Sequence, residues 1–457
     1  MLILRYGSLA IVLACFSTAI ALRGLDSPLL PLGIWGGLVI LLVLRVFKVT
    51  AEEIAIFFLP LVMLSLTALT GLKPLYFTTL WLAFLLYSWA IRKTRTGWAT
   101  KPVQAAYLLP FIVIAVLTVF SVILNPIQDL TLGSLLQTLA LGPTYWLLVQ
   151  MLGASNLRRL LGAFLLGCVA GALVFLIAFG QGSPLIALAA IPYGLGRAWV
   201  LDMNPNSWAI YPLLGLPIAA GLWTYGSRRW IQRLWLWPAA LLLIGVLALT
   251  LSRSAMLGIA VGLMFLLAAR SRGRRILAVS FSLLGVSLLL WSSGLLKILD
   301  PVLRVHSGLS GRAGVWQMAL DNIERNPLFG IGFGSFQNLA FFRAPFTENG
   351  LTMMIDLPTT HNAFLAIATE IGVPAMLIAL AIFPLFFYRT HFLWPKVKGG
   401  PEGVILITCS SIMAAGFARA LFESDFILPH AYLYENLPLI LMLALQDLLY
   451  YREFTSA

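Results

Sequence analysis

Hydrophobic residues along this chain fall into long runs rather than into the short alternating stretches of a soluble protein. Runs of roughly 18–22 apolar residues recur, and each is long enough to cross a bilayer as an α-helix. The expected spans are residues 5–22, 29–47, 54–71, 74–91, 103–124, 132–153, 160–180, 207–225, 234–252, 255–270, 277–296, 362–388, 403–421 and 432–450. The pattern therefore predicts an all-α polytopic membrane protein with about 14 (12–14) transmembrane helices.

The composition supports the same class of protein. Of the residues, 60% are hydrophobic and only 10% are charged, and the mean hydropathy is +0.95. No soluble core needs so much apolar sequence. Because no repeat, low-complexity tract or separate soluble region interrupts the runs, we expect residues 1–457 to form a single transmembrane domain.

The first run also has features of a cleavable signal peptide. Arg5 precedes apolar residues that end in the small-residue stretch STAIA. Because many further spans follow, we expect this segment to stay attached as the first transmembrane helix.

The basic residues predict the orientation of the chain. If the N-terminus is cytoplasmic, twenty lysines and arginines fall on the inside, five in short outside loops and five in one long outside loop. Cytoplasmic loops carry the excess of Lys and Arg in membrane proteins. We therefore expect both termini in the cytoplasm, and we attribute the net charge of +13 to orientation rather than to nucleic-acid binding.

The sequence gives no sign of metal or disulfide chemistry. Cys15, Cys168 and Cys409 all lie inside apolar runs, which predicts neither a disulfide framework nor a thiolate metal site. The four histidines form no His-x-x-His pair, and the chain has no Asp-x-Asp motif. We therefore expect no metal site and no cofactor.

The long outside loop, residues 297–360, is expected to contain short helices. The segment GRAGVWQMALDNIERNPLFGIGFGSF at 311–336 has the pattern of a helix that ends at Asn326-Pro327 and is followed by a tight turn. One face of this helix is formed by Val315, Met318, Ala319, Asn322 and Ile323. The turn lacks the G-x-G-x-x-G spacing of a dinucleotide site. The loop and the membrane helices are expected to form one working unit.

Two arginines on the outer side are candidate anion ligands. Arg253, in TLSRSAM, lies near hydrocarbon, where a guanidinium must snorkel, pair or line a polar cavity. The flanking Ser252 and Ser254 favour the cavity. Arg312 falls in the first turn of the loop helix, which Ser310 can cap, and free helix N–H groups together with a guanidinium suit a bound phosphate. A surface arginine paired with a nearby acid would show the same pattern.

His361, in PTTHNAF, is a candidate proton acceptor. It comes just before a long apolar run, so we expect it beside a helix N-terminus, whose dipole favours the neutral imidazole. A neutral imidazole can accept a proton from a hydroxyl. A capping or interfacial histidine is the structural alternative, and His306 and His430 are weaker candidates.

Asparagines and acids near the outer ends of other spans are less specific. Asp202, Asn204 and Asn206 in LDMNPNSW could hold sugar hydroxyls or simply cap a helix.

The segment RALFESDF offers Glu423 and Asp425 at a further outer end. Arg419 lies one helical turn before Glu423, so the simple interpretation is an i,i+4 ion pair. Glu370 falls inside a predicted span and should face protein or water.

Three segments resemble the O-antigen ligase and polymerase superfamily. They are SRSAMLG at 252–258, the segment 311–336, and HNAFLAIATEIGVP at 361–374. Their order also matches: paired spans around the Ser-Arg motif, a long outer loop, and then His-Asn opening a span. The resemblance covers about residues 200–430, whereas the first six spans match only as apolar sequence.

The resemblance implies a metal-independent, inverting glycosyltransferase of the bacterial inner membrane whose active site faces the periplasm. Such enzymes take a glycan from undecaprenyl pyrophosphate and pass it to a hydroxyl of lipid A-core or of another lipid-linked glycan. Arg253 and Arg312 fall on the family's arginines for the pyrophosphate, and His361 falls on its essential histidine. The remaining candidates for glycan or acceptor contacts are Asp202, Asn204, Asn206, Ser252, Ser254, Asn362 and Glu423.

The resemblance leaves two activities open, because ligases and polymerases use the same donor and similar motifs. We take the O-antigen ligase as the first expectation. A solute transporter is the alternative of another class. It would usually show paired broken helices or repeat symmetry near the membrane midplane, whereas the notable polar residues here gather at the outer surface. The expected partners are therefore the lipid-linked donor, the acceptor and membrane lipids.

Cysteines placed at positions 320 and 395 test the predicted orientation. On intact spheroplasts, an impermeant thiol reagent should label Leu320→Cys, in the long outer loop, and not Pro395→Cys, in an inside segment. The unsubstituted chain, whose cysteines lie in apolar runs, is the control. Labelling at 395 without labelling at 320 would reverse the topology.

Overall fold

The computed structural model describes most of the chain as helices. The described residues are 50–63, 74–96, 104–125, 132–152, 156–180, 185–186, 197–198, 204–225, 234–270, 312–336, 343–348, 351–356, 359–427 and 433–455. The helices are α3 (Ala51–Met63), α5 (Pro74–Thr96), α6 (Leu108–Leu124), α7 (Leu132–Leu139), α8 (Leu141–Leu152), α9 (Leu157–Gly180), α10 (Pro205–Trp208), α11 (Ile210–Tyr225), α13 (Leu236–Thr250), α14 (Arg253–Arg270), α17 (Arg312–Arg325), α19 (Ala363–Glu370), α20 (Val373–Val397), α21 (Pro401–Ala420) and α22 (Leu433–Thr455).

The helices follow the apolar runs, so the predicted helical class is confirmed. In the described part of the chain, four segments are long and apolar enough to cross a membrane: Leu135–Leu152, Leu157–Gly180, Val373–Val397 and Pro401–Ala420. Shorter apolar helices include Leu108–Leu124, Leu236–Thr250 and Arg253–Ala269. The predicted spans 5–22, 29–47 and 277–296 lie outside the described residues.

One predicted span, 362–388, is wrong as a single helix. The structure divides it into α19 and α20 at Ile371-Gly372. Gly372 has a φ of 111°, and a Cβ there would overlap the carbonyl oxygen of Leu328. The Val373 N–H donates to the Pro327 carbonyl (2.8 Å). The turn that follows α17 therefore occupies the break, where only glycine allows so close a backbone approach.

The long loop contains a β-hairpin as well as the predicted helix. Strand β3 (Arg343–Glu348) pairs antiparallel with β4 (Leu351–Asp356), with Arg343 opposite Asp356 and Glu348 opposite Leu351. A second pair, β1 (Leu185–Ile186) with β2 (Arg197–Ala198), is minimal. The fold is therefore predominantly α-helical, as predicted, and the loop adds a β-hairpin that was not predicted. The sequence signal was Asn-Gly between the two strands, which is typical of a hairpin turn.

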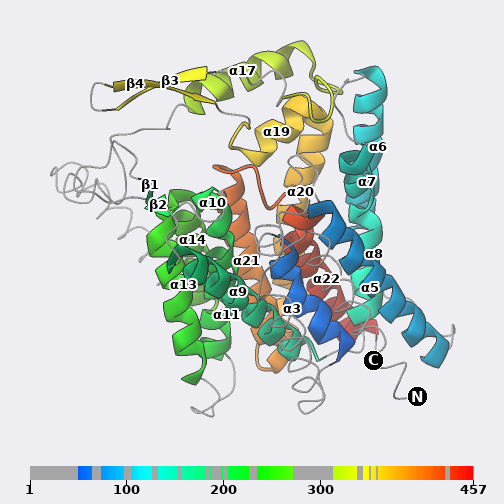
Figure 1. Cartoon of the computed structure of the whole chain (residues 1–457). Coiled ribbons are helices and arrows are strands. Elements are labelled where there is room, and N and C mark those ends of the chain that lie inside the picture. The colour runs from blue at the N-terminus through cyan, green and yellow to red at the C-terminus, as the bar shows by residue number, and fades with distance from the viewer. Residues whose placement is uncertain are drawn as a thin grey trace, which may run out of the picture.

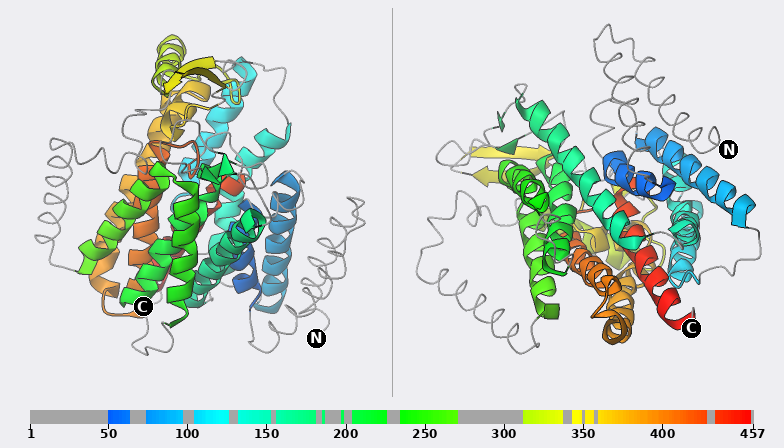
Figure 2. Two further views of the ribbon diagram at one scale, coloured as in Figure 1. Left: turned by 60° about the vertical axis from the view of Figure 1, so that its left-hand side comes forward. Right: turned by 90° about the horizontal axis from the view of Figure 1, so that it is seen from below.

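The loop elements gather at one end of the helical bundle. Figure 1 shows α17, the β3–β4 hairpin and α19 at the top, and the C-terminus at the opposite end. The left view of Figure 2 shows the same separation. Seen from below, α20, α21 and α22 lie between α13 and α14 on one side and α5 and α8 on the other (Figure 2). The buried core runs through these contacts, and many large apolar side chains, such as Leu109 and Trp237, remain exposed on the outside of the bundle. A bilayer would cover such a surface.

Helices α14 and α21 pack closely through small residues. A Cβ at Gly258 would lie 2.6 Å from Leu213 Cδ1 and 2.7 Å from the Ala415 carbonyl oxygen. One turn later, Ser411 Oγ donates to the Gly262 carbonyl (2.6 Å). Small residues let membrane helices approach to backbone distance. Because α14 begins where α21 ends, this contact fixes the position of Arg253 relative to the segment that follows Ala420.

Replacing Gly258 by leucine should destabilise the protein. The added side chain would overlap Leu213 and Ala415, and such overpacking typically costs about 1–3 kcal/mol. The melting temperature of the detergent-solubilised protein should fall. Gly245→Leu on α13 is the matched control, because a Cβ there meets nothing within 4 Å. Equal melting temperatures for the two variants would contradict the close packing.

Candidate active site

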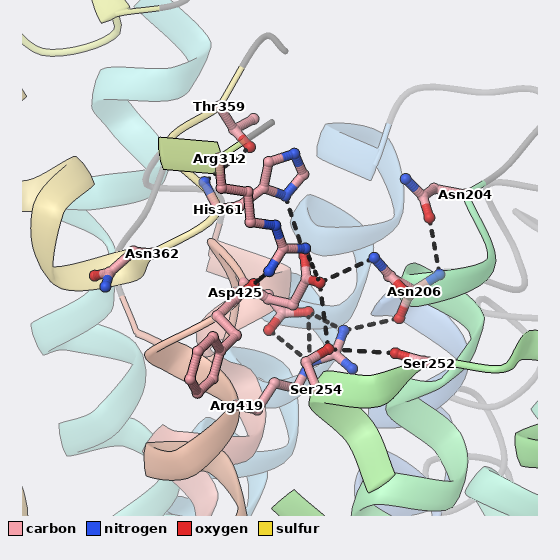
Figure 3. A network of polar contacts seen from close by, with 12 residues as sticks. Asn204, Asn206, Ser252, Ser254, Arg312, Thr359, His361, Asn362, Arg419 and Asp425 are labelled. Carbon is pink, nitrogen blue, oxygen red and sulfur yellow. Dashed lines mark hydrogen bonds and ion pairs between the residues drawn. The ribbon is translucent and has the colours of Figure 1, made fainter. Parts of the chain in front are cut away.

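Polar side chains from five separate segments meet at the end of the bundle below α17. They come from the start of α10, the start of α14, the start of α17, the residues before α19 and the segment after α21 (Figure 3). The fold brings them together because α14, α17 and α19 all begin at this end and α21 finishes here. Helix N-termini and side-chain donors are thus concentrated around one point.

Glu423 lies at the centre of this cluster. Its Oε1 accepts hydrogen bonds from Asn206 Nδ2 (2.9 Å), Arg312 Nη2 (2.9 Å) and Ser254 Oγ (3.2 Å). Its Oε2 lies 3.3 Å from His361 Nδ1. Only 6% of the residue is exposed. One buried carboxylate therefore joins four of the polar residues that the sequence singled out.

The surroundings of Glu423 keep it ionised. Burial acts to raise the pKa of Glu423, but the hydrogen bond from His361 and nearby positive charge, chiefly that of Arg312, outweigh burial and lower it to about 2. A buried carboxylate is stable only when charged and hydrogen-bonded partners replace its water. Near neutral pH, the cluster therefore contains a fixed negative charge.

Arg312 is held by the start of α17 and by the segment after α21. Besides the contact with Glu423, its Nη1 donates to the Phe422 carbonyl (2.5 Å). One turn along α17, Trp316 Nε1 donates to the Thr360 carbonyl, next to His361 (2.8 Å). The interpretation of Arg312 as a residue paired with an acid is correct, but the acid is buried in a polar cluster rather than on the surface. Ser310, the predicted cap, lies outside the described residues.

His361 does not cap α19. The N-cap is Asn362, whose Oδ1 accepts from the Leu365 N–H (3.0 Å) and whose Nδ2 donates to the Leu421 carbonyl (3.1 Å). The backbone of His361 is left-handed, with a φ of 47°. This conformation directs the imidazole toward Glu423, and Nε2 points away from the cluster (Figure 3). The capping alternative for His361 is therefore wrong, and Asn362 has that structural role.

The predicted side-chain ion pair of Arg419 with Glu423 is also wrong. Arg419 pairs instead with Asp425, through Nε to Oδ1 (2.8 Å) and Nη2 to Oδ2 (2.5 Å). Its Nη2 also donates to the Asn206 carbonyl (2.8 Å). Helix α21 ends at Ala420, and the left-handed Phe426 (φ 75°) follows Asp425 in the turn that brings this acid back onto Arg419. Glu423 is thereby left for Arg312 and His361.

Arg253 opens α14 beside this cluster. It follows a sharp corner at Leu251, which has a φ of 46° and ends α13. The hydroxyls of the flanking Ser252 and Ser254 lie 3.2 Å apart, and both residues are buried. Ser254 in turn contacts Glu423. The polar surroundings expected for Arg253 are therefore present, and its own side chain is partly buried.

The other candidates lie outside the centre. Asn204 caps α10 by accepting from the Asn206 N–H (2.8 Å), as the helix-capping alternative predicted. Glu370 is buried on α19 and accepts from the Phe336 N–H (3.3 Å), so it faces protein as expected and holds the glycine-rich turn. Asp202, His306 and His430 lie outside the described residues. Within the described ranges, no three His, Cys, Asp or Glu side chains form a group that could hold a metal ion.

The sequence did not identify Glu423 as the centre of the site. It appeared there as one of several possible glycan or acceptor contacts and as an ion partner of Arg419. The missed signal was the presence of two acids, Glu423 and Asp425, just past the end of a predicted span. Because Asp425 pairs with Arg419, Glu423 is available for other partners.

Comparisons with known proteins support the predicted resemblance. The family model described as O-Antigen ligase matches residues 238–380. An O-antigen ligase of Pseudomonas aeruginosa is 29% identical over 238 residues, which cover 50% of this chain and 53% of that protein. Exopolysaccharide production protein ExoQ of Rhizobium meliloti is 24% identical over 186 residues, which cover 39% of this chain and 41% of that protein. The chain thus spans about half the length of these relatives or less. The resemblance to the O-antigen ligase and polymerase superfamily is confirmed.

Proposed function

We propose that this chain, similar over residues 238–380 to O-antigen ligases, is a membrane glycosyltransferase. It transfers a glycan from undecaprenyl pyrophosphate to a hydroxyl of lipid A-core. The observation that carries the proposal is the convergence of a guanidinium, Arg312, and an imidazole, His361, on the same buried carboxylate. A pyrophosphate donor needs the first group, and an acceptor hydroxyl needs the second.

The donor pyrophosphate binds between Arg253 and Arg312. Both residues are the first of their helices, so each arginine starts from a helix N-terminus. This combination favours phosphate through charge-assisted hydrogen bonds and the helix dipole. As the bond from the sugar C1 to the phosphate oxygen breaks, negative charge grows on the leaving pyrophosphate. The arginines neutralise this charge, so the reaction needs no metal ion.

His361 activates the acceptor. Its Nδ1 faces Glu423 and its Nε2 is directed away from the cluster, where an acceptor can approach. With the proton on Nδ1, Nε2 can accept the proton of the attacking hydroxyl. The acceptor oxygen then bonds to C1 on the face opposite the leaving pyrophosphate, so the anomeric configuration inverts. The products are the joined glycan and undecaprenyl pyrophosphate.

The site faces the periplasm in this proposal. The cluster lies at the end of the bundle opposite the C-terminus (Figure 1), and the charge bias of the loops predicts cytoplasmic termini. About 14 helices, including those predicted from 5–22, 29–47 and 277–296, would anchor the chain in the inner membrane. The loop at 297–360 would then form one wall of a site that is reached by a lipid-linked donor.

A strain that lacks this protein separates the candidate functions. The loss of a ligase should leave lipid A-core without long chains while lipid-linked polymer accumulates. The absence of that polymer would instead indicate a polymerase. Unchanged surface polysaccharide would contradict both transferase assignments and favour a transporter.

Arg312 should be needed for donor binding. Arg312→Lys keeps the charge but loses the two-pronged hydrogen bonding of a guanidinium. It should therefore weaken turnover of the purified protein at limiting donor. Arg312→Ala should weaken turnover further, by at least about tenfold, because hydrogen bonds to charged groups are lost. The same substitutions at Arg325, exposed at the other end of α17, are the control. Wild-type turnover of Arg312→Ala at limiting donor would refute the assignment.

His361→Asn should separate catalysis from structure. Asparagine tolerates the left-handed backbone at this position, and the cap on Asn362 is untouched. The variant should fold and bind the donor, but it should transfer glycan at least about a hundredfold more slowly, because it cannot accept the proton.

His391→Asn, at an exposed position on α20, is the control for this substitution and should be as active as the wild type. If folded His361→Asn protein transfers glycan at a near-normal rate, His361 is not the base.

A further inference from the structure

We propose that Glu423 is an internal counter-ion that occupies the donor-phosphate site until the donor binds. In this proposal, which rests on the proposed function, the phosphate displaces the carboxylate from Arg312. Glu423 then retains His361 and orients it for catalysis. Glu423 is thus a positioning residue with opposite effects on donor binding and on turnover.

The contacts of Arg312 carry the first step. Both terminal nitrogens of its guanidinium are occupied by consecutive residues of one segment: Nη1 by the Phe422 carbonyl and Nη2 by Glu423 Oε1. A phosphate that binds on this side of the guanidinium therefore competes with Phe422 and Glu423 for the same N–H groups. Of the two contacts, the carboxylate is the one that a second anion repels.

The donor set around Glu423 Oε1 carries the second step. A guanidinium, an amide and a hydroxyl, from Arg312, Asn206 and Ser254, all point to this one oxygen. Such a set of charged and neutral donors equally suits a phosphate oxygen. Glu423 therefore keeps the donors oriented while the phosphate is absent. Without an internal anion, the partly buried Arg312 would lack a compensating charge.

The exposure of the side chains indicates which group a ligand from solvent can reach first. The side chain of Glu423 is 8% exposed, whereas those of Arg312 and His361 are 17% and 18% exposed. The carboxylate is thus the most buried of the three groups, and Arg312 and His361 lie nearer the surface. A phosphate that enters from solvent therefore reaches Arg312 before Glu423.

The second oxygen of Glu423 keeps the carboxylate in contact with His361. Oε2 contacts His361 Nδ1 and none of the three donors to Oε1. Oε1 can therefore be displaced while Oε2 still fixes the imidazole. When His361 takes the acceptor proton at Nε2, the imidazole becomes a cation, and the adjacent carboxylate stabilises it, as the acid of a catalytic triad does. The neighbouring acid, Asp425, cannot substitute because Arg419 binds it.

Glu423→Gln tests the proposal, since it keeps the size of the side chain and removes its charge. The affinity of the purified protein for undecaprenyl pyrophosphate should rise by about threefold to tenfold, because a competing negative charge is lost. Turnover at saturating glycan-loaded donor should fall by at least about tenfold, because His361 loses its ionic partner. A merely structural role would lower both affinity and turnover.

Two further variants complete the experiment. Asp321→Asn makes the same acid-to-amide change on the exposed face of α17 and should alter neither quantity. Glu423→Asp keeps the charge but withdraws the carboxylate by one methylene. It should raise donor affinity and lower turnover, as Glu423→Gln does. If melting curves show that the glutamine variant is unfolded, the aspartate variant provides the test of the proposal.

The outcomes distinguish this inference from the function on which it rests. If the wild type binds undecaprenyl pyrophosphate no better than undecaprenol and transfers no glycan, both proposals fail. If the wild type binds and transfers, but the folded Glu423 variant has unchanged or weaker donor affinity, only the counter-ion proposal is overturned. Tighter binding with slower turnover supports it.

Discussion

A buried carboxylate in a largely apolar protein requires several hydrogen-bond donors. At Glu423 these donors come from separate segments, so the carboxylate holds the whole site together. Its two oxygens receive hydrogen bonds or charge from Asn206, Ser254, Arg312 and His361. These residues are far apart in the sequence. An ionised group without them would be too costly to bury. The polar cluster is therefore mutually dependent: each donor is held by the acid, and the acid is stable only with its donors.

The loop that carries Arg312 stays in place through backbone hydrogen bonds. The glycine-rich turn after α17 donates from Ile331 to the Thr369 carbonyl (2.8 Å) and from Gly332 to the Glu370 carbonyl (3.2 Å). Val315 and Ala319 of α17 are buried against Phe336 of the turn. Helix α17, the turn and α19 thus form one outer unit. Because this unit also includes the residues just before α19, it sets the position of Arg312 relative to His361.

The sequence predicted what depends on periodicity and failed where distant backbone segments meet. Apolar runs gave most helix positions, and the spacing of Val315, Met318 and Ala319 gave the buried face of α17. The break at Gly372 was missed because it depends on a contact with Leu328, which is distant in the sequence. No local sequence pattern predicts such a contact. For the same reason, Arg312, His361 and Arg253 could be named as candidates, whereas the ion partners of Arg312 and Arg419 could not. Pairing across a fold is decided by geometry rather than by spacing along the chain.

Within the outer unit, main-chain hydrogen bonds connect the glycine-rich turn to α19. This has a consequence for how the sequence of the unit can change. Main-chain hydrogen bonds do not depend on side-chain identity, so the solvent-facing positions of α17, such as Asp321 and Glu324, can change without moving Arg312. Glycine is required only where the backbone approaches closely or has a positive φ, as at Gly330 and Gly372. The exterior of this unit can therefore vary in sequence while the polar cluster beneath it keeps its geometry.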